Sequence, residues 1–130
     1  MINMKYLLDT HTFLWCFEGS DKLSEKAKSI LLDESVSKYI SIASLWEFSI
    51  KYSLGNLPFE GGLSHLCDLI KQYDFILLPI KQPYLAKLID LPYIHRDPFD
   101  RLIISTALVD DMTIVTADGD VREYDISWVW

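Results

Sequence analysis

Several features that identify common protein classes are scarce in this chain of 130 residues. It has only two cysteines, Cys16 and Cys67, both in apolar, helix-like segments without metal-ligand spacing. We therefore expect reduced thiols in or near the core, with neither disulfides nor a zinc site. No apolar run approaches the length of a membrane span, and the run after the N-terminus is too short for a secretory leader. These absences favour a cytoplasmic protein.

Basic residues are also few: 12 lysines and arginines stand against 19 aspartates and glutamates, and the formal net charge is -7. This balance argues against sequence-blind binding of nucleic acid through a basic surface, although a metal ion can still mediate contact with phosphate groups. Hydrophobic residues make up 50% of the chain, enough at this length for one core. We therefore expect a single domain spanning residues 1–130.

Short β-prone runs alternate with helical patterns along the chain. Strands are expected at residues 5–8, 38–42, 74–79, 113–116 and 126–130. Helices are expected at about residues 12–18, 24–33, 44–54, 63–73 and 83–91, and from residue 98 onward. Because strands separated by helices form parallel sheets with right-handed crossovers, the sequence predicts an α/β fold whose ligands gather outside the carboxyl ends of the strands.

Four acidic residues would meet at that edge. Asp9 ends the first strand and Asp118 follows the fourth, while the first turns of two helices carry the others, Glu47 and Asp100. Carboxylates crowded in this way repel one another, and burial increases the repulsion, so the cluster requires a cation. Mg2+ or Mn2+ suits oxygen ligands of this kind. The reaction class that such a site supports is metal-assisted hydrolysis of a phosphodiester.

Helix capping offers a simpler explanation for some of these acids. Asp97 and Pro98 form a natural helix opening that places Asp100 at the third helical position, near free backbone amides. The pattern Ser-Leu-Trp-Glu predicts a capping box that pairs Ser44 with Glu47. A non-catalytic interaction domain, in which the acids only cap helices, is therefore an open alternative.

Four segments together resemble a known family: Leu-Leu-Asp-Thr-His at residues 7–11, Ser-Leu-Trp-Glu-Phe-Ser-Ile-Lys at 44–51, Arg-Asp-Pro-Phe-Asp-Arg at 96–101 and Val-Thr-Ala-Asp at 115–118. In order and spacing they are similar to the PIN-domain ribonucleases, specifically the VapC-type toxins of bacterial toxin–antitoxin pairs. The resemblance covers essentially the whole chain. It implies a three-layer α/β/α fold with a five-stranded parallel sheet, Mg2+-dependent endoribonuclease activity on RNA, a homodimer, and inhibition by a cognate antitoxin protein.

The resemblance also assigns roles to the acidic residues. Asp9 and Asp100 match the main metal ligands, directly or through water. Glu47 matches a further ligand or the group that positions the attacking water, and Asp118 matches an outer or second-metal ligand. Asp97 is a fifth candidate, for which helix capping is the simpler explanation.

Five neighbouring residues are candidates for supporting roles. Thr10 and Thr116 adjoin two of the acids and can hydrogen-bond carboxylates or water, or simply form the turns. Lys51 lies one turn beyond Glu47, and Arg96 and Arg101 bracket the start of the acidic helix. These three basic residues are candidates for contacting the RNA backbone or for orienting carboxylates, while a plain surface or ion-pair role is equally consistent.

Two other enzyme classes place acids at the ends of parallel strands. A receiver-type signalling module binds Mg2+ but needs an acidic pair at the first strand and a lysine after the last. Here the first strand offers only Asp9, and the chain ends at Trp130 without that lysine. A haloacid-dehalogenase-like phosphatase needs an aspartate where His11 stands. Both match the sequence less well than a metal-dependent nuclease.

Overall fold

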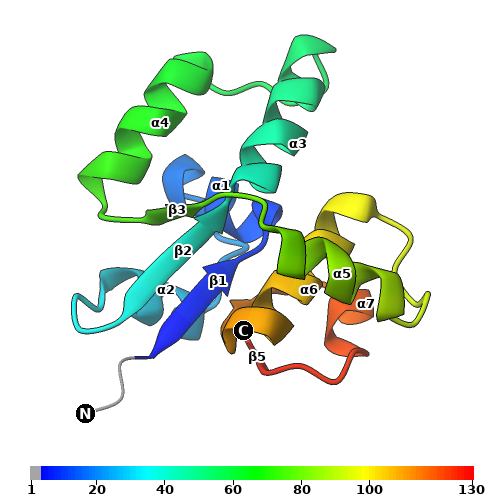
Figure 1. The fold of residues 1–130 in the computed structure, drawn as a ribbon. Helices are drawn as coiled ribbons and strands as arrows, with labels where there is room; N and C mark the ends of the chain where they lie inside the picture. Colours follow the sequence, from blue (N-terminus) through cyan, green and yellow to red (C-terminus); the bar gives the residue numbers. More distant parts are fainter. Residues whose placement is uncertain (1–3) are drawn as a thin grey trace.

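A parallel sheet lies at the centre of the computed structural model, which describes residues 4–130 (Figure 1). The predictions of a single domain over residues 1–130 and of no secretory leader include residues 1–3, which lie outside the described residues. The strands are β1 (Lys5–Leu8), β2 (Ser37–Ser41), β3 (Ile76–Leu78), β4 (Thr113–Val115) and β5 (Trp128–Val129). They form a five-stranded sheet in the order β3-β2-β1-β4-β5, and every pairing is parallel.

Seven helices connect and cover these strands within residues 4–130. They are α1 (Thr10–Glu18), α2 (Glu25–Leu32), α3 (Ile42–Ser53), α4 (Gly62–Gln72), α5 (Gln82–Asp90), α6 (Pro98–Asp110) and α7 (Gly119–Arg122). Helix α6 packs against both α5 and α7 at one side of the sheet (Figure 1). In this described part of the chain, no helix is long and apolar enough to cross a membrane.

The two faces of the sheet carry separate hydrophobic cores. Leu8, at the end of β1, belongs to the core that includes Phe13 of α1 and Ala27 of α2. Its neighbour Leu7 belongs to a second core with Ile103 of α6. Successive strand residues point to opposite faces, so helices cover both sides. The predicted three-layer α/β/α fold with a five-stranded parallel sheet is confirmed.

Helix α6 begins as the sequence predicts. The Asp97 side chain accepts hydrogen bonds from the backbone N–H groups of Phe99 (2.8 Å) and Asp100 (3.2 Å), and Pro98 occupies the first helical position. Farther along, the helix is buried on most sides. A buried helix body fixes the direction of its first turn, so Asp100 is held rigidly at the edge of the core.

The predicted capping box before Glu47 is wrong. Helix α3 begins at Ile42, where the sequence predicted the last strand residue, because the Ser41 side chain accepts a hydrogen bond from the backbone N–H of Ala43 (3.0 Å). Glu47 therefore lies in the second turn, too far along the helix to cap it. This correction removes the capping explanation for Glu47.

Other element boundaries also differ from the predictions. Helix α1 starts at Thr10, two residues before the predicted start, with Asp9 as its N-cap. Strands β3 and β5 are shorter than expected. Helix α7 is not predicted, because a helix of 4 residues is too short to show a periodic pattern. Its N-cap is Asp118, whose side chain accepts a hydrogen bond from the backbone N–H of Asp120 (2.9 Å).

Candidate active site at the carboxyl edge of the sheet

Asp9 is a buried carboxylate at the end of the central strand, and each of its two oxygens accepts a hydrogen bond. Oδ1 accepts a hydrogen bond from the backbone N–H of Thr12 (2.9 Å) and so caps α1. Oδ2 accepts one from the hydroxyl group of Thr116 (2.5 Å), which follows the adjacent strand β4. The neighbouring Thr10 donates to the Ser44 hydroxyl (2.9 Å) and ties this turn to α3. Both threonines are thus structural parts of the site.

Glu47 is a deeply buried carboxylate, with 3% of its surface exposed, and it caps no helix. Oε2 accepts a hydrogen bond from Lys51 Nζ at 2.7 Å, and this ion pair raises the pKa of the lysine. Oε1 is buried without any hydrogen-bond partner. A buried carboxylate oxygen without a donor is costly in free energy, and a bound cation is one group that would satisfy it.

Asp100 lies within reach of the other acids. Its pKa rises to about 7 because it is buried and because the negative charges of Asp97, Asp9 and Glu47 act on it. The same carboxylate, together with Asp97, also acts on Lys51. The charges of Asp9, at the end of β1, and of Glu47 on α3 therefore act on Asp100 in the first turn of α6. Burial also raises the pKa of Asp9, against the lowering effect of its hydrogen bonds to Thr116 and Thr12.

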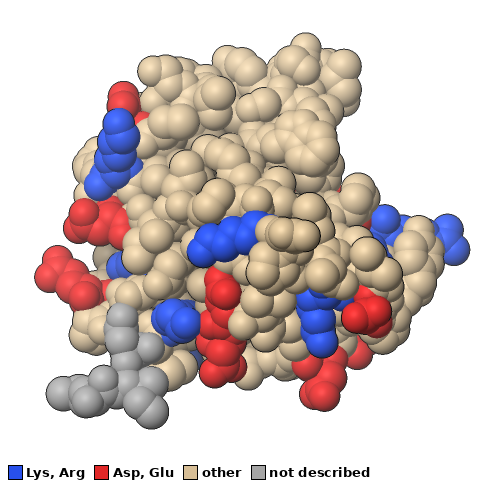
Figure 2. Space-filling model, viewed as in Figure 1, with Lys and Arg blue, Asp and Glu red and all other residues tan. Residues whose placement is uncertain are grey.

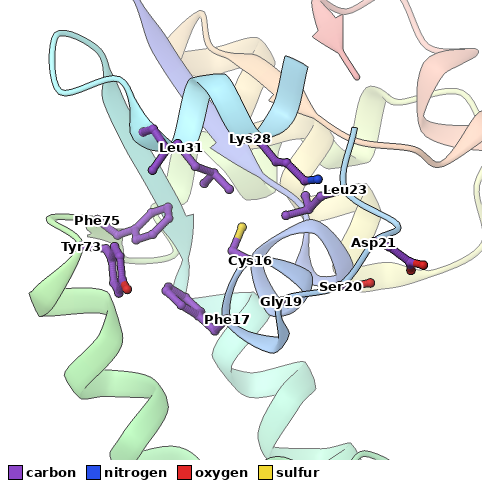
Figure 3. Close-up of a pocket in the computed structure, with 11 residues that line it drawn as sticks. Cys16, Phe17, Gly19, Ser20, Asp21, Leu23, Lys28, Leu31, Tyr73 and Phe75 are labelled. Atoms are coloured by element: carbon purple, nitrogen blue, oxygen red, sulfur yellow. The ribbon is translucent and has the colours of Figure 1, made fainter. Parts of the chain in front are cut away.

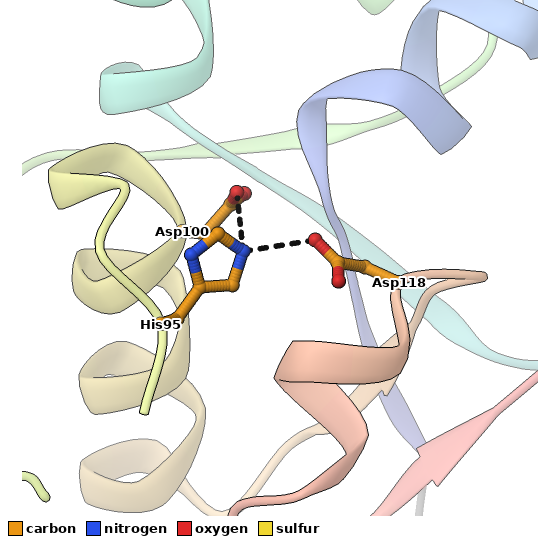
Figure 4. Close-up of side chains that lie close together, drawn as sticks. All are labelled: His95, Asp100 and Asp118. Atoms are coloured by element: carbon orange, nitrogen blue, oxygen red, sulfur yellow. Dashed lines mark hydrogen bonds and ion pairs between the residues drawn. The ribbon is translucent and has the colours of Figure 1, made fainter. Parts of the chain in front are cut away.

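Asp118 joins the cluster through a histidine. His95 Nε2 lies 2.9 Å from Asp118 Oδ2 and 3.1 Å from Asp100 Oδ2 (Figure 4). Partial burial acts to raise the pKa of Asp118, but the hydrogen bonds from His95 and from the Asp120 backbone outweigh it, so the pKa lies below its usual value. Burial acts to lower the pKa of His95, and the hydrogen bond to Asp118 and the charge of Asp100 outweigh it, so that pKa is raised.

Sequence reasoning missed His95. It directly precedes the Arg-Asp-Pro-Phe-Asp-Arg stretch, and this position in the sequence indicated that it lies near Asp100. It has, however, no ligand spacing to another histidine. Among the described residues, one group of at least three histidine, cysteine or acidic side chains has ligand atoms within 4.8 Å of one another, and it consists of His95, Asp100 and Asp118. Asp9 and Glu47 lie outside that group. The site therefore contains an imidazole as well as carboxylates.

The basic candidates have three different environments. Lys51 pairs with Glu47 inside the site. Arg96 is exposed, in the segment that leads into α6. Arg101 is buried and donates hydrogen bonds to the carbonyl oxygens of Pro92 and Leu88 and to the Tyr124 hydroxyl. Arg101 thus holds neighbouring segments together, which is a structural role.

A large cavity lies elsewhere and has a different character. It measures about 470 Å3 and is lined mainly by apolar side chains of α1, α2 and the segment that leads into β3, including Phe17, Leu23, Leu31 and Phe75 (Figure 3). Cys16 also faces it, and burial raises the pKa of this thiol to about 12. A protonated thiol among apolar groups is neither a nucleophile nor a metal ligand. The acidic cluster is therefore the candidate active site, and this cavity is not.

The chain matches the PIN domain over residues 6–127. It belongs to the PIN domain family. Membership of this family disfavours the receiver and dehalogenase alternatives. No curated protein matches this PIN domain.

Solved structures share the fold at low sequence identity. One is VapBC2 from Rickettsia felis bound to a DNA fragment from their promoter, with a TM-score of 0.74, 17% identity, and coverage of 98% of this chain and 99% of that one. Another is VapBC-1 from nontypeable Haemophilus influenzae, with a TM-score of 0.68, 19% identity and 97% coverage of both chains. A third is FitAcB from Neisseria gonorrhoeae, with a TM-score of 0.65, 19% identity and 96% coverage of both.

Proposed function

We propose that this PIN domain is an endoribonuclease that hydrolyses phosphodiester bonds in RNA and depends on Mg2+, for which Mn2+ can substitute. The observation that carries the proposal is the buried Glu47 Oε1, which has no hydrogen-bond partner and stands among other carboxylates. Helix capping does not explain that atom, because Glu47 lies in the second turn of α3. A cation would both satisfy it and offset the repulsion within the cluster.

The residues present fit a hard divalent ion. Asp9 and Glu47 are carboxylates whose charges act on the Asp100 carboxylate, and oxygen ligands of this kind suit Mg2+ and Mn2+. Asp118 stands farther out, with 36% of its side chain exposed, and would bind through water or hold a second ion. When bound, the ion would offset the charge of the phosphate oxygens and make a water molecule easier to deprotonate.

The chain's own groups would position the reactants. Glu47 Oε1 would either ligate the ion or, in place of that, accept the hydrogen of the attacking water. Lys51, whose Nζ already pairs with Glu47, and the exposed Arg96, which follows His95 in the chain, are the basic groups that would contact the phosphate backbone. With so few basic groups, the RNA would be held by a small number of contacts.

We further propose that this chain is a toxin of the cytoplasm with a cognate antitoxin protein as its partner. The solved relatives named VapBC and FitAcB support this proposal. An open reading frame immediately upstream that encodes a short DNA-binding protein with a flexible tail would support it further. Copurification of the two products would test the pairing, and an antitoxin that binds without suppressing cleavage would contradict it.

A homodimer is the second part of that proposal. Trp46 and Ile50 of α3 and Leu54, its C-cap, follow one another at one-turn intervals and are 57%, 38% and 67% exposed. The face that includes α3 carries few charged side chains in Figure 2. Burial of such a face in a second copy would remove apolar surface from water. Sedimentation of wild type and of Ile50→Asp tests this: a monomeric wild type would contradict it.

Cleavage itself is tested with purified protein and a structured RNA. We expect cutting in Mg2+, loss of cutting in EDTA, and recovery on adding Mg2+ or Mn2+. Attack by water with departure of the 3′ oxygen leaves a 5′ phosphate. Cutting that persists in EDTA, or products that end in a cyclic phosphate, would contradict the metal mechanism. Metal binding without cleavage of any RNA would favour the interaction domain instead.

A further inference from the structure

His95 lies at the centre of the site, and the ligand roles proposed for the acids leave it without a role. Its ring comes from the segment between α5 and α6 and stands between Asp100, in the first turn of α6, and Asp118, the N-cap of α7 (Figure 4). One ring nitrogen, Nε2, is within hydrogen-bond distance of both carboxylates, at 3.1 Å and 2.9 Å. That nitrogen is either a potential metal ligand or a hydrogen-bond donor, and the two roles need opposite tautomers.

The other ring nitrogen distinguishes these roles. The backbone N–H of Asp97 points at His95 Nδ1, with the two nitrogens 3.1 Å apart. A backbone amide can only donate, so Nδ1 must offer its lone pair, and the hydrogen of the neutral ring is on Nε2. Protonation of Nδ1 would cost the bond from Asp97 but would leave Nε2 a donor. A metal ligand, by contrast, needs a free lone pair on Nε2.

The backbone around His95 is held equally firmly. The Tyr124 hydroxyl accepts hydrogen bonds from the N–H groups of Ile94 (3.1 Å) and His95 (2.9 Å) and donates one to the Pro92 carbonyl (2.7 Å). Arg101, on α6, donates a hydrogen bond of 3.2 Å to the same hydroxyl. Tyr124 is itself buried in the core beside α6. The backbone of His95 is therefore fixed beside α6, and the hydrogen bond from the Asp97 N–H to Nδ1 favours the observed orientation of the ring.

We propose that His95 is a positioning residue whose Nε2–H holds Asp100 and Asp118 in one arrangement and that it does not itself ligate the metal ion. The proposal rests on the metal-dependent function proposed above. His95 Nε2 hydrogen-bonds Asp118 and lies within ion-pair distance of Asp100, so it links the start of α7 to the start of α6. Asp118 Oδ1 also accepts the backbone N–H of Asp120, so the Asp100 and Asp118 carboxylates are held in a fixed orientation relative to each other.

Nuclear magnetic resonance of the ring nitrogens tests the tautomer directly. In protein labelled with nitrogen-15 at histidine, we expect hydrogen on Nε2 of His95 in EDTA and at saturating Mg2+. His95→Gln identifies the resonances by their loss. An unprotonated Nε2 in either state would overturn the proposal. Because the measurement in EDTA needs no metal, it remains informative even if the protein binds no Mg2+, a result that would contradict the proposed function alone.

Calorimetric titration with Mg2+ and Mn2+ tests the consequence for binding. His95→Ala removes the donor and should weaken both affinities by about tenfold or more, the usual cost of losing a partner that orients a ligand. His95→Gln restores a side-chain N–H donor and should return both affinities close to wild type. His65→Ala on α4 is the matched control and should change neither. A ligand role would make Gln as harmful as Ala, and an unchanged affinity in His95→Ala would also overturn the proposal.

Discussion

Thr116 donates a hydrogen bond of 2.5 Å from its hydroxyl group to Asp9 Oδ2 across two adjacent parallel strands. The register explains the contact: Leu8 of β1 pairs with Val115 of β4, so the next residue of each strand lies beside the other. The same hydroxyl accepts a hydrogen bond from the backbone N–H of Asp118 at 3.0 Å. One threonine therefore connects two of the site's acids, which lie at the ends of neighbouring strands.

Replacing Thr116 tests this connection. Thr116→Val keeps the shape of the side chain but leaves Asp9 Oδ2 and the Asp118 N–H without this partner. We expect the free energy of unfolding to fall by about 1 to 3 kcal/mol and Mg2+ binding to weaken. Urea denaturation and calorimetry measure the two effects. Thr116→Ser keeps the hydroxyl and should behave like wild type, so equal loss in both variants would contradict the assignment.

Neutralising either main carboxylate should separate activity from folding. We expect Asp9→Asn or Asp100→Asn to lower the rate of RNA cleavage by about a thousandfold or more, because each would remove a metal ligand worth several kcal/mol. Both variants should still fold. Asp100→Asn should not lower the melting temperature in EDTA, since removing one charge relieves repulsion. Asp9→Asn should lower it modestly, because the amide replaces the oxygen that accepts the Thr116 hydrogen bond. Asp68→Asn, on an exposed face of α4, is the matched control. A variant that unfolds would show instead that the carboxylate is structural.

The raised pKa of Asp100 makes stability depend on pH. Its pKa is about 7 in the metal-free protein against an ordinary value of 3.8, so the folded state binds the proton more tightly. The stabilisation is fully present below about pH 4 and is lost as the pH rises through 7. In EDTA, the unfolding free energy of wild type should therefore decline relative to Asp100→Asn between these values.

Saturating Mg2+ should reverse that trend, because the ion binds the ionised carboxylate. Chemical denaturation of wild type and Asp100→Asn at several pH values, with and without Mg2+, measures both effects. Parallel curves for the two proteins would show that Asp100 is not perturbed.

The Lys51–Glu47 pair should compete with the metal ion. Lys51→Met leaves the buried Glu47 carboxylate without its 2.7 Å partner, so we expect lower stability in EDTA. Because Lys51 is partly exposed, the loss should be about 1 to 2 kcal/mol. Mg2+ should then raise the melting temperature more than in wild type. The double variant Glu47→Gln, Lys51→Met should recover stability, and its failure to recover would contradict the pairing.

The two arginines that bracket the start of α6 should respond differently. Arg96 is exposed, so Arg96→Ala should leave the melting temperature unchanged, weaken RNA binding, and reduce its salt dependence by about one phosphate contact. Arg101 is buried against two carbonyl groups and Tyr124, so Arg101→Met should lower the melting temperature. Thermal melts and binding measured at two salt concentrations distinguish them. Similar effects of both changes would contradict this division.

Local chemistry explains how much of the fold could be predicted from sequence. The start of α6 depends only on Asp97, Pro98 and Asp100, whose capping bonds lie within three residues of one another, so it was predicted correctly. The capping box failed because Ser41 and Ser44 both offer a local hydroxyl, and only the end of β2 decides which one begins the helix. Local patterns do not specify that choice.

The sequence by itself determined that acidic residues follow the ends of β1 and β4 and open α6, because strand ends and helix caps are set by neighbours along the chain. Only the tertiary structure decided that Glu47 has a buried oxygen without a partner and that His95 stands between Asp100 and Asp118. It also decided that Arg101 serves the core rather than the surface. Those contacts join residues many positions apart, and packing across the sheet, which no local pattern encodes, brings them together.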